Sequence, residues 1–162
     1  MQILTHEQIR QKIKRLAIEI LEHNCDEAEL ILAGINNNGM KFAELLLAEL
    51  QPIAAMPLHL TRIRLNPADP LAQEVQVGMP LKEIDGKAVI VIDDVANTGR
   101  TIFYAIKPLL DILPQKIEVA VLVDRTHKSF PVKVDYIGLS LATTLMDNIE
   151  VRLEGEMAAF LE

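Results

Sequence analysis

The chain is predicted to be an α/β protein with a mostly parallel central sheet flanked by helices. Two observations predict this class. Short apolar runs typical of buried strands alternate with segments of helical period along most of the 162 residues, and such alternation is typical of a parallel sheet. Hydrophobic residues make up 50% of the sequence but aromatic residues only 4%, so we expect a core of Ile, Leu, Val and Ala, as in sheets covered on both faces.

The first half of the chain is expected to form two helices and two strands. A helix spans residues 5–21, where apolar side chains recur with helical period and Thr5 precedes Gln8 in a capping-box pattern. A strand over 30–35 and a helix over 39–50 form the first βα unit. A strand over 57–65 leads into a segment that runs to residue 80, interpreted as a mobile loop with a short β-ribbon piece near Val75.

The second half begins with Asp85-Gly86, which is expected to turn the chain into a strand over 87–93. The following helix would run to about residue 113, with a kink or an early end at Pro108, because proline disrupts a helix interior. Further strands are expected over 117–123, 136–141 and 149–153, the last of them ending the fold. No linker or repeat interrupts this order, so residues 1–162 are predicted to be one domain.

Composition excludes several classes of function. The formal net charge of −7 argues against an extended nucleic-acid surface, which would need clustered positive charge. Cys25 is the only cysteine, so an intrachain disulfide is impossible and a structural zinc site is not expected. Neither a signal-peptide pattern nor a run of 18 apolar residues is present. We therefore expect a cytoplasmic protein without membrane contact.

The strongest functional signal lies between residues 89 and 101. A buried-strand pattern ends in Asp93 and Asp94, and a short turn then opens a helix with Thr98-Gly99-Arg100-Thr101. The N-terminus of a helix offers unpaired N–H donors and a positive dipole end, which favour a phosphate. The two carboxylates would face ribose hydroxyls or hydrated Mg²⁺ beside it. The alternative is that Asp-Asp only ends a strand and Thr-Gly only caps a helix.

Three more polar segments stand at predicted strand ends. The segment 36–39, Asn-Asn-Asn-Gly, tolerates unusual backbone angles and exposes amide donors suited to a diphosphate, although an ordinary polar turn is the alternative. Asp124 and Arg125 end another strand, where they would either border a ligand pocket or neutralise each other at the surface. Arg62 and Arg64 either reach a diphosphate or are solvated strand residues.

The order of apolar strand, Asp93-Asp94 and Thr98-Gly99-Arg100-Thr101 is the signature of type I phosphoribosyltransferases, whose substrate is phosphoribosyl diphosphate (PRPP), and the chain resembles these enzymes. Over nearly its whole length it is most similar to the family of bifunctional pyrimidine operon regulators and uracil phosphoribosyltransferases. The similarity extends to Ile9, Lys12 and Arg15 and to residues 33–35, 120–125 and 135–138. The last two stretches distinguish this family from other phosphoribosyltransferases.

The resemblance implies a type I phosphoribosyltransferase fold with a mobile loop over the active site. It also implies Mg²⁺-dependent transfer of ribose 5-phosphate from PRPP to a nucleobase, with a pyrimidine such as uracil expected, in nucleotide salvage and in a homodimer or larger homo-oligomer. Asp93 and Asp94 would be catalytic and bind Mg²⁺, with Arg64 as a third catalytic residue. The PRPP-binding residues would be Ala96, Asn97, Thr98, Gly99, Arg100 and Thr101, at the 5-phosphate, and Asn36, Asn37, Asn38 and Gly39, at the diphosphate. Val123, Asp124 and Arg125 would form the base pocket.

Some positions depart from the family pattern. Asn97 stands where purine-using relatives commonly have Asp, which disfavours a purine without excluding it. Asn38 replaces a usual Arg, and residues 63–66 keep the arginine of the usual Tyr-Arg-Asp-Asp but lose both acids. A catalytically weak PRPP- or nucleotide-binding regulatory protein and a purine phosphoribosyltransferase therefore remain alternatives. RNA binding is not expected, because the family's RNA surface is basic and this chain is acidic.

Overall fold

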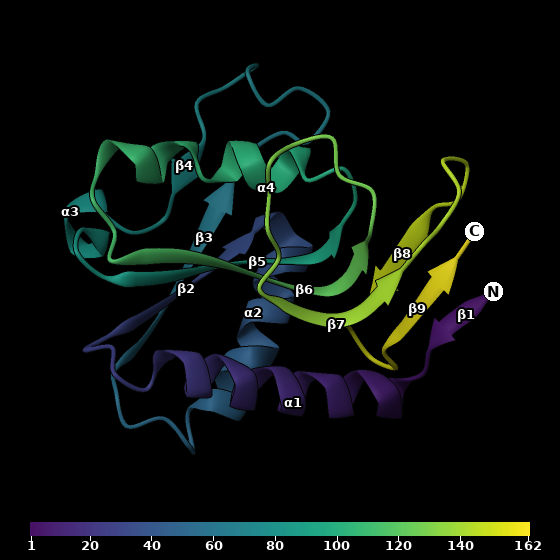
Figure 1. Ribbon diagram of the computed structural model, residues 1–162, viewed down its shortest axis with the longest axis horizontal. Helices are drawn as coiled ribbons and strands as arrows, with labels where there is room; N and C mark the ends of the chain where they lie inside the picture. The colour runs from purple at the N-terminus through teal and green to yellow at the C-terminus, as the bar shows by residue number, and fades with distance from the viewer.

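The computed structural model describes residues 1–162 and has a six-stranded sheet at its centre (Figure 1). The strand order is β4-β3-β2-β5-β6-β7. The strands are Leu30–Ile35 (β2), Leu58–Arg64 (β3), Gln76–Val77 (β4), Ala88–Ala96 (β5), Lys116–Arg125 (β6) and Tyr136–Leu141 (β7). All neighbours pair in parallel except β4, which is antiparallel to β3. The predicted α/β class with a mostly parallel sheet is confirmed.

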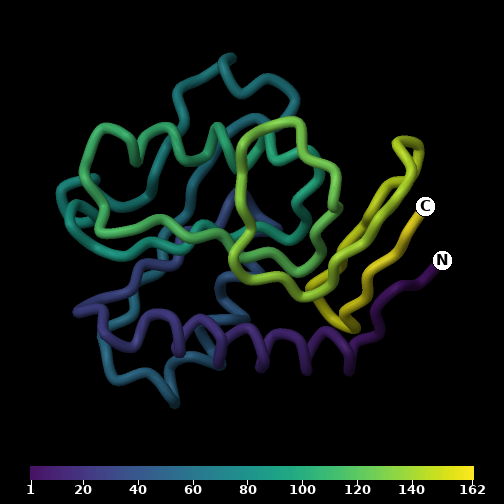
Figure 2. Tube along the Cα trace, viewed as in Figure 1, coloured from purple at the N-terminus to yellow at the C-terminus, as the bar shows by residue number.

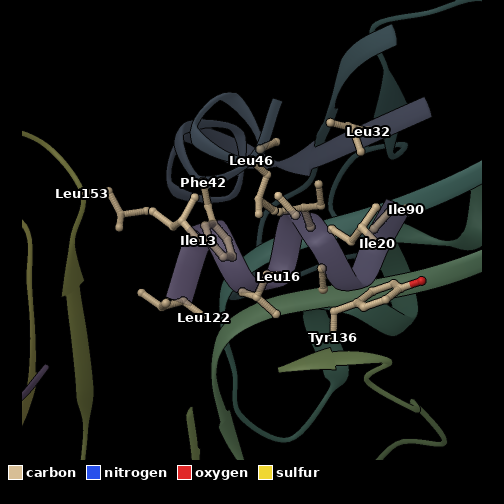
Figure 3. Packing of buried hydrophobic residues seen from close by; sticks show 14 of the residues in the cluster. Ile13, Leu16, Ile20, Leu32, Phe42, Leu46, Ile90, Leu122, Tyr136 and Leu153 are labelled. Carbon is tan, nitrogen blue, oxygen red and sulfur yellow. The ribbon is translucent and has the colours of Figure 1, made fainter. Parts of the chain in front are cut away.

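Helices cover both faces of this sheet. The helices α1 (His6–Asn24) and α2 (Asn36–Leu50) lie on one face, and α3 (Leu81–Ile84), α4 (Arg100–Ala105) and the 3₁₀ helix η1 (Lys107–Asp111) lie on the other (Figure 1). Strand residues alternate between two apolar clusters of 24 and 14 buried residues, because successive side chains point to opposite faces. Figure 3 shows Leu16 and Ile20 of α1 and Leu46 of α2 in the larger cluster.

The first helix follows the sequence pattern closely. Thr5 Oγ1 accepts a hydrogen bond from the Gln8 backbone N–H at 3.3 Å, and Gln8 Oε1 accepts one from the Thr5 N–H at 2.9 Å, which confirms the predicted capping box. The buried face of α1 carries the residues of the apolar period: Ile9, Ile13, Leu16 and Ile20. The helix continues to Asn24, three residues beyond the predicted end.

A second sheet joins the two ends of the chain and was not predicted. The strands β1 (Gln2–Leu4), β9 (Ala158–Leu161) and β8 (Ile149–Arg152) form an antiparallel sheet in the order β1-β9-β8. The termini therefore lie side by side (Figure 2), and the Met1 amino group donates to the Leu161 carbonyl at 2.7 Å. The prediction that the strand near residue 149 ends the fold is wrong. The strands β1 and β9, of three and four residues, are too short to show a period.

Two other boundaries differ from the prediction and affect the site. The strand β5 passes through the acid pair and ends at Ala96, and α2 begins at Asn36 rather than at residue 39. The four-residue helix α3 was missed. The early helix end at Pro108 is confirmed, because α4 stops at Ala105 and η1 carries the proline in its first turn. The predicted ribbon piece corresponds to β4.

Candidate active site

The carboxyl ends of the parallel strands place most of the predicted site residues at one edge of the sheet. The end of β2 leads into α2, the end of β5 carries Asp93 and Asp94, and the end of β6 carries Asp124 and Arg125. Hydrogen bonds from Asn38 to Asp94 and from Arg125 to Asn97 show that these segments meet. Open parallel sheets bind ligands at this edge, so the position agrees with the chemistry expected from the sequence.

The two acids differ in environment although they are neighbours. Asp93 is 9% exposed, and its Oδ1 accepts from the Asp94 backbone N–H at 2.9 Å. Asp94 is half-buried, and its Oδ1 accepts from the Val95 N–H at 2.9 Å. Burial, with the neighbouring Asp94 carboxylate as a second cause, raises the pKa of Asp93 well above its ordinary value. Asp94 is thus the more accessible of the two carboxylates.

The acid pair fits a magnesium ion that is held jointly with substrate. No group of three or more His, Cys, Asp or Glu side chains is placed to hold a metal in the protein alone. Mg²⁺ usually keeps waters and binds one or two carboxylates together with substrate phosphates. Two adjacent carboxylates at the end of β5 are that kind of partial ligand set.

The segment Asn36–Gly39 is the first turn of α2, so the prediction of a turn preceding the helix is wrong. Asn36 has a φ of 51°, and its Oδ1 accepts from the Leu65 N–H at 3.1 Å. Asn38 Nδ2 donates to Asp94 Oδ2 at 3.2 Å. No side chain caps this helix, so the N–H groups of its first turn remain available to an anion beside the acids.

Gly39 allows α2 to approach β5 closely. A Cβ atom at this position would lie 2.6 Å from the Ile92 carbonyl oxygen and 3.3 Å from Asp93 Oδ1. Both the backbone of β5 and the buried acid would therefore be displaced by any side chain. Because residue 39 has no side chain, the first turn of α2 can lie against the acid pair.

The segment from Ala96 to Thr101, the predicted phosphate loop, runs from the last residue of β5 into the first turn of α4. Residues 95–102 line a small pocket of about 40 Å³. Gly99 has a φ of 87°, in the left-handed region that favours glycine, and α4 begins at the next residue. The Thr98 carbonyl accepts from the Ser129 N–H at 3.0 Å and from the Phe130 N–H at 3.2 Å. These hydrogen bonds connect the loop to the segment between β6 and β7.

The side chain of Arg100 reaches the loop after β3. Its Nη2 donates to the Pro67 carbonyl at 2.6 Å and to the Ala68 carbonyl at 2.9 Å. The backbone of Arg100 belongs to the phosphate loop, whereas its guanidinium holds the segment predicted to be mobile. Arg100 thus connects the predicted phosphate loop to the loop after β3.

Asp124 and Arg125 do not neutralise each other, so the surface-pair alternative is wrong. Asp124 is 8% exposed and accepts from Lys128 Nζ at 2.6 Å. Arg125 donates to Thr143 Oγ1 at 2.7 Å, to the Thr144 carbonyl at 2.6 Å and to Asn97 Oδ1 at 3.3 Å. Val123 is fully buried. Both charged side chains are therefore engaged within the protein.

The partners of these residues were not predicted from the sequence. Lys128 stands four residues after Asp124, a spacing that could have suggested the pair. Thr143 and Thr144 belong to the connection between β7 and β8, and no local pattern linked them to Arg125. In the same connection Asp147 accepts from the Thr144 N–H at 2.7 Å, and hydrogen bonds from Thr144 lower the pKa of Asp147.

Arg64 lies apart from the acid pair. It is the exposed last residue of β3, and it lines a pocket with Met40 and Gln76. Its side chain makes no hydrogen bond or ion pair to Asp93 or Asp94. No hydrogen bond or ion pair to the acids therefore supports the predicted catalytic role of Arg64.

Comparison with known proteins identifies the family. A family model described as "Phosphoribosyl transferase domain" matches residues 1–154. The chain belongs to the phosphoribosyltransferase family. This phosphoribosyltransferase is 33% identical over 160 residues to the "Bifunctional protein PyrR" of Chloroflexus aurantiacus, with 94% of this chain and 87% of that protein covered. It is 36% identical over 161 residues to the protein of the same name from Deinococcus deserti, with 93% and 86% covered.

Solved structures confirm the fold. A hypoxanthine-guanine phosphoribosyltransferase from Bacillus anthracis matches with a TM-score of 0.73 at 19% identity, covering 87% of this chain and 82% of that chain. A hypoxanthine phosphoribosyltransferase from Staphylococcus aureus matches with a TM-score of 0.73 at 20% identity, covering 90% and 80%. The predicted type I phosphoribosyltransferase fold is therefore confirmed. None of the helices of this phosphoribosyltransferase combines the length and apolar character needed to cross a membrane.

Proposed function

We propose that this phosphoribosyltransferase transfers ribose 5-phosphate from PRPP to a nucleobase, with Mg²⁺ bound at Asp93 and Asp94 and a pyrimidine such as uracil as the acceptor. The observation that carries the proposal is the hydrogen bond from Asn38 to Asp94. It joins the uncapped N-terminus of α2 to the acid pair, and the phosphate loop follows the acid pair directly along the chain. Two anion-binding segments and a metal-binding pair are what PRPP requires.

The proposed chemistry needs little covalent help from the protein. Departure of diphosphate leaves an oxocarbenium-like ribose carbon, so catalysis lies in positioning the reactants and stabilising the charge of the leaving group. When bound, Mg²⁺ would neutralise part of the diphosphate charge. The first turn of α2, with Asn36, Asn37 and Asn38, would hold the diphosphate by N–H donors. Ala96 to Thr101 would hold the 5-phosphate.

Further assignments complete the proposal. The end of β6, from Val123 to Arg125, would bound the base, contacting it through backbone groups because the Asp124 and Arg125 side chains are occupied. Arg64 would reach the leaving group from the end of β3 when the loop that follows it moves. A single domain over residues 1–162, a homo-oligomer and a cytoplasmic location also remain proposals.

A pyrimidine is favoured over a purine by two observations. The relatives at 33% and 36% identity carry the name PyrR, whereas the solved purine phosphoribosyltransferases are 19% to 22% identical. In addition, Asn97 Oδ1 accepts from Arg125. An amide in that position cannot take up a proton from the base as a carboxylate could.

A second candidate function is PRPP or nucleotide sensing with little turnover. It is favoured by the lack of a cation in the segment Asn36–Gly39 and by the engagement of the Arg100 guanidinium with loop carbonyls. Sequence-specific RNA binding is not proposed. Counterion release requires clustered cations, and the formal net charge is −7.

The experiment that tests the proposal is diphosphate release from PRPP and Mg²⁺ against a panel of pyrimidine and purine bases. The expected result is base-dependent release that is fastest with uracil or another pyrimidine. The variant Asp93→Asn/Asp94→Asn serves as the inactive control. Saturable PRPP binding without release for any base would establish the sensor function instead, and release with purines only would reverse the proposed specificity.

A further inference from the structure

Residues 65–68, the start of the loop after β3, form a bridge between two segments of the candidate active site. At one end of the bridge, the Leu65 N–H donates a hydrogen bond to Asn36 Oδ1 in the first turn of α2, at 3.1 Å. At the other end, Arg100 Nη2 donates to the carbonyls of the last two bridge residues, at 2.6 and 2.9 Å. The bridge therefore links the segment proposed to hold the diphosphate of PRPP to the loop proposed to hold its 5-phosphate.

The rest of this loop, at the top of Figure 1, has no comparable attachment. Residues 69–74 make hydrogen bonds only among themselves, from the Leu71 and Ala72 N–H groups to Asp69. A hollow of about 400 Å³ lies between this stretch and η1. Segments with few contacts to the core are those that open most readily. The mobile part of the loop therefore begins after the bridge, and the bridge belongs to the framework of the site.

The backbone of Asn36 is unusual in a way that agrees with this task. Its φ of 51° makes it the only non-glycine residue of the chain with a positive φ. Asparagine enters that region more readily than most residues, but such conformations are uncommon and concentrate at functional sites. Glycine would suit the backbone equally well, but it could not accept the hydrogen bond from Leu65. The bridge therefore explains why this position carries an asparagine side chain.

Arg64 directly precedes the bridge and depends on it for its position. It is the exposed last residue of β3, and its guanidinium takes part in none of the seven ion pairs of the chain. We propose that Asn36 and Arg100 are positioning residues, which through the bridge set the position from which Arg64 reaches the departing diphosphate. This inference rests on the proposed transfer from PRPP and names how one residue of that site is placed.

The position of the guanidinium matters most at the step in which the diphosphate departs. Negative charge on the diphosphate grows as its bond to the ribose breaks, so a guanidinium contact stabilises the transition state more than it stabilises bound PRPP. A loose bridge would spread Arg64 over many positions and weaken this contact. Loss of the bridge should therefore lower kcat and leave the KM for PRPP nearly unchanged.

The first test measures amide hydrogen exchange at Leu65 without PRPP. Asn36→Gly removes the acceptor oxygen, and glycine tolerates the φ of 51° at this position. The Leu65 amide should then exchange at least about tenfold faster than in the native chain. Asn37→Gly, the same change at the next residue of the turn, is the matched control and should leave this rate unchanged. An unchanged rate in Asn36→Gly would overturn the proposal, because the contact would then not hold the bridge.

The second test is a double-mutant cycle in the diphosphate-release assay. Asn36→Gly and Arg64→Met should each lower kcat by about tenfold, the value of one charge-assisted contact, while the KM for PRPP changes by less than about twofold. Because Asn36 acts through Arg64, the double variant should be no slower than Arg64→Met alone. Arg100→Met should give the same result in the same cycle with Arg64→Met.

Fully additive losses in the cycle would overturn the proposal, because Asn36 or Arg100 would then act on PRPP independently of Arg64. A rise in KM at constant kcat would likewise assign the lost contact to PRPP binding and not to the placement of Arg64. If the native chain releases no diphosphate with any base, the proposed transfer is refuted and Arg64 has no leaving group to reach. The exchange measurement contains no PRPP, so it decides separately whether Asn36 holds the bridge.

Discussion

Asn38 Nδ2 lies 3.2 Å from Asp94 Oδ2 and donates a hydrogen bond to it across 56 residues of sequence. The contact joins the first turn of α2 to the end of β5. It also satisfies one oxygen of the more accessible acid with a neutral donor, at a position where the resembled family usually has an arginine. The geometry of the acid pair therefore depends on an amide rather than on an ion pair.

Replacing this amide by a carboxylate should destabilise the protein. In Asn38→Asp, two carboxylates would lie within hydrogen-bond distance, and at neutral pH their repulsion should lower the free energy of unfolding by about 1 kcal/mol. Asn37→Asp adds the same charge to the same helix turn without facing Asp94, so it is the matched control. Urea unfolding at pH 7 measures both. Equal effects of the two substitutions would show that the contact with Asp94 contributes nothing.

Asp93 should make stability fall as pH rises in metal-free solution. Its pKa is raised in the folded state, mainly by burial, so between the unfolded and folded pKa values the folded state binds more protons. Stability is fully retained below the unfolded pKa and decreases as pH rises toward the folded value. Asp93→Asn removes this loss of stability. At pH 7 the variant should therefore have a higher Tm than the native chain, by about 2–4 °C for each kcal/mol of unfolding free energy regained. The difference should vanish near pH 4, and a difference independent of pH would refute the raised pKa.

Gly39 should not tolerate a side chain. Alanine normally favours a helix over glycine, but here its Cβ would lie 2.6 Å from the Ile92 carbonyl oxygen. Gly39→Ala should therefore lower the free energy of unfolding by about 1–3 kcal/mol, the usual cost of overpacking. Asn37→Ala, an exposed change on the same turn, should be neutral or stabilising. Denaturant titration of both variants gives the comparison, and a stable Gly39→Ala protein would mean that α2 can move away from β5.

Arg100 should restrain the loop after β3. Arg100→Met removes its two hydrogen bonds to the Pro67 and Ala68 carbonyls. Amide hydrogen exchange over residues 66–75 should become faster, because the segment loses a contact to the core of the fold. Amide hydrogen exchange in β5 and β6 should not change. The control variant Arg10→Met should leave exchange in the loop unchanged. Unchanged exchange in the loop would show that other contacts hold it.

Local patterns predicted the fold better than the contacts of the site. The capping box at Thr5 and the break at Pro108 are encoded within a few residues, and the structure has both. The strand β5, by contrast, continues for two residues beyond Asp94. The helical start at Asn36 was missed because asparagine is a poor helix former. The close contact of Gly39 with β5, which accompanies that start, is tertiary and invisible in the local sequence.

The partners of Arg125 illustrate the same limit. Its hydrogen bonds to Thr143 and Thr144 depend on where the β7–β8 connection lies, which no pattern within that connection specifies. The antiparallel sheet of β1, β9 and β8 also depends on pairing between opposite ends of the chain. Its strands of three and four residues are too short to carry a period of their own.

Calorimetric titration of PRPP determines whether PRPP binds with Mg²⁺ at the acid pair. With Mg²⁺ present, the native chain should bind PRPP at one saturable site. Asp93→Asn/Asp94→Asn should weaken binding by about a hundredfold, or about 2.8 kcal/mol, and removal of Mg²⁺ should weaken the native chain to a similar extent. Undiminished affinity in the double variant would mean that PRPP binds elsewhere and that the acid pair does not form its site.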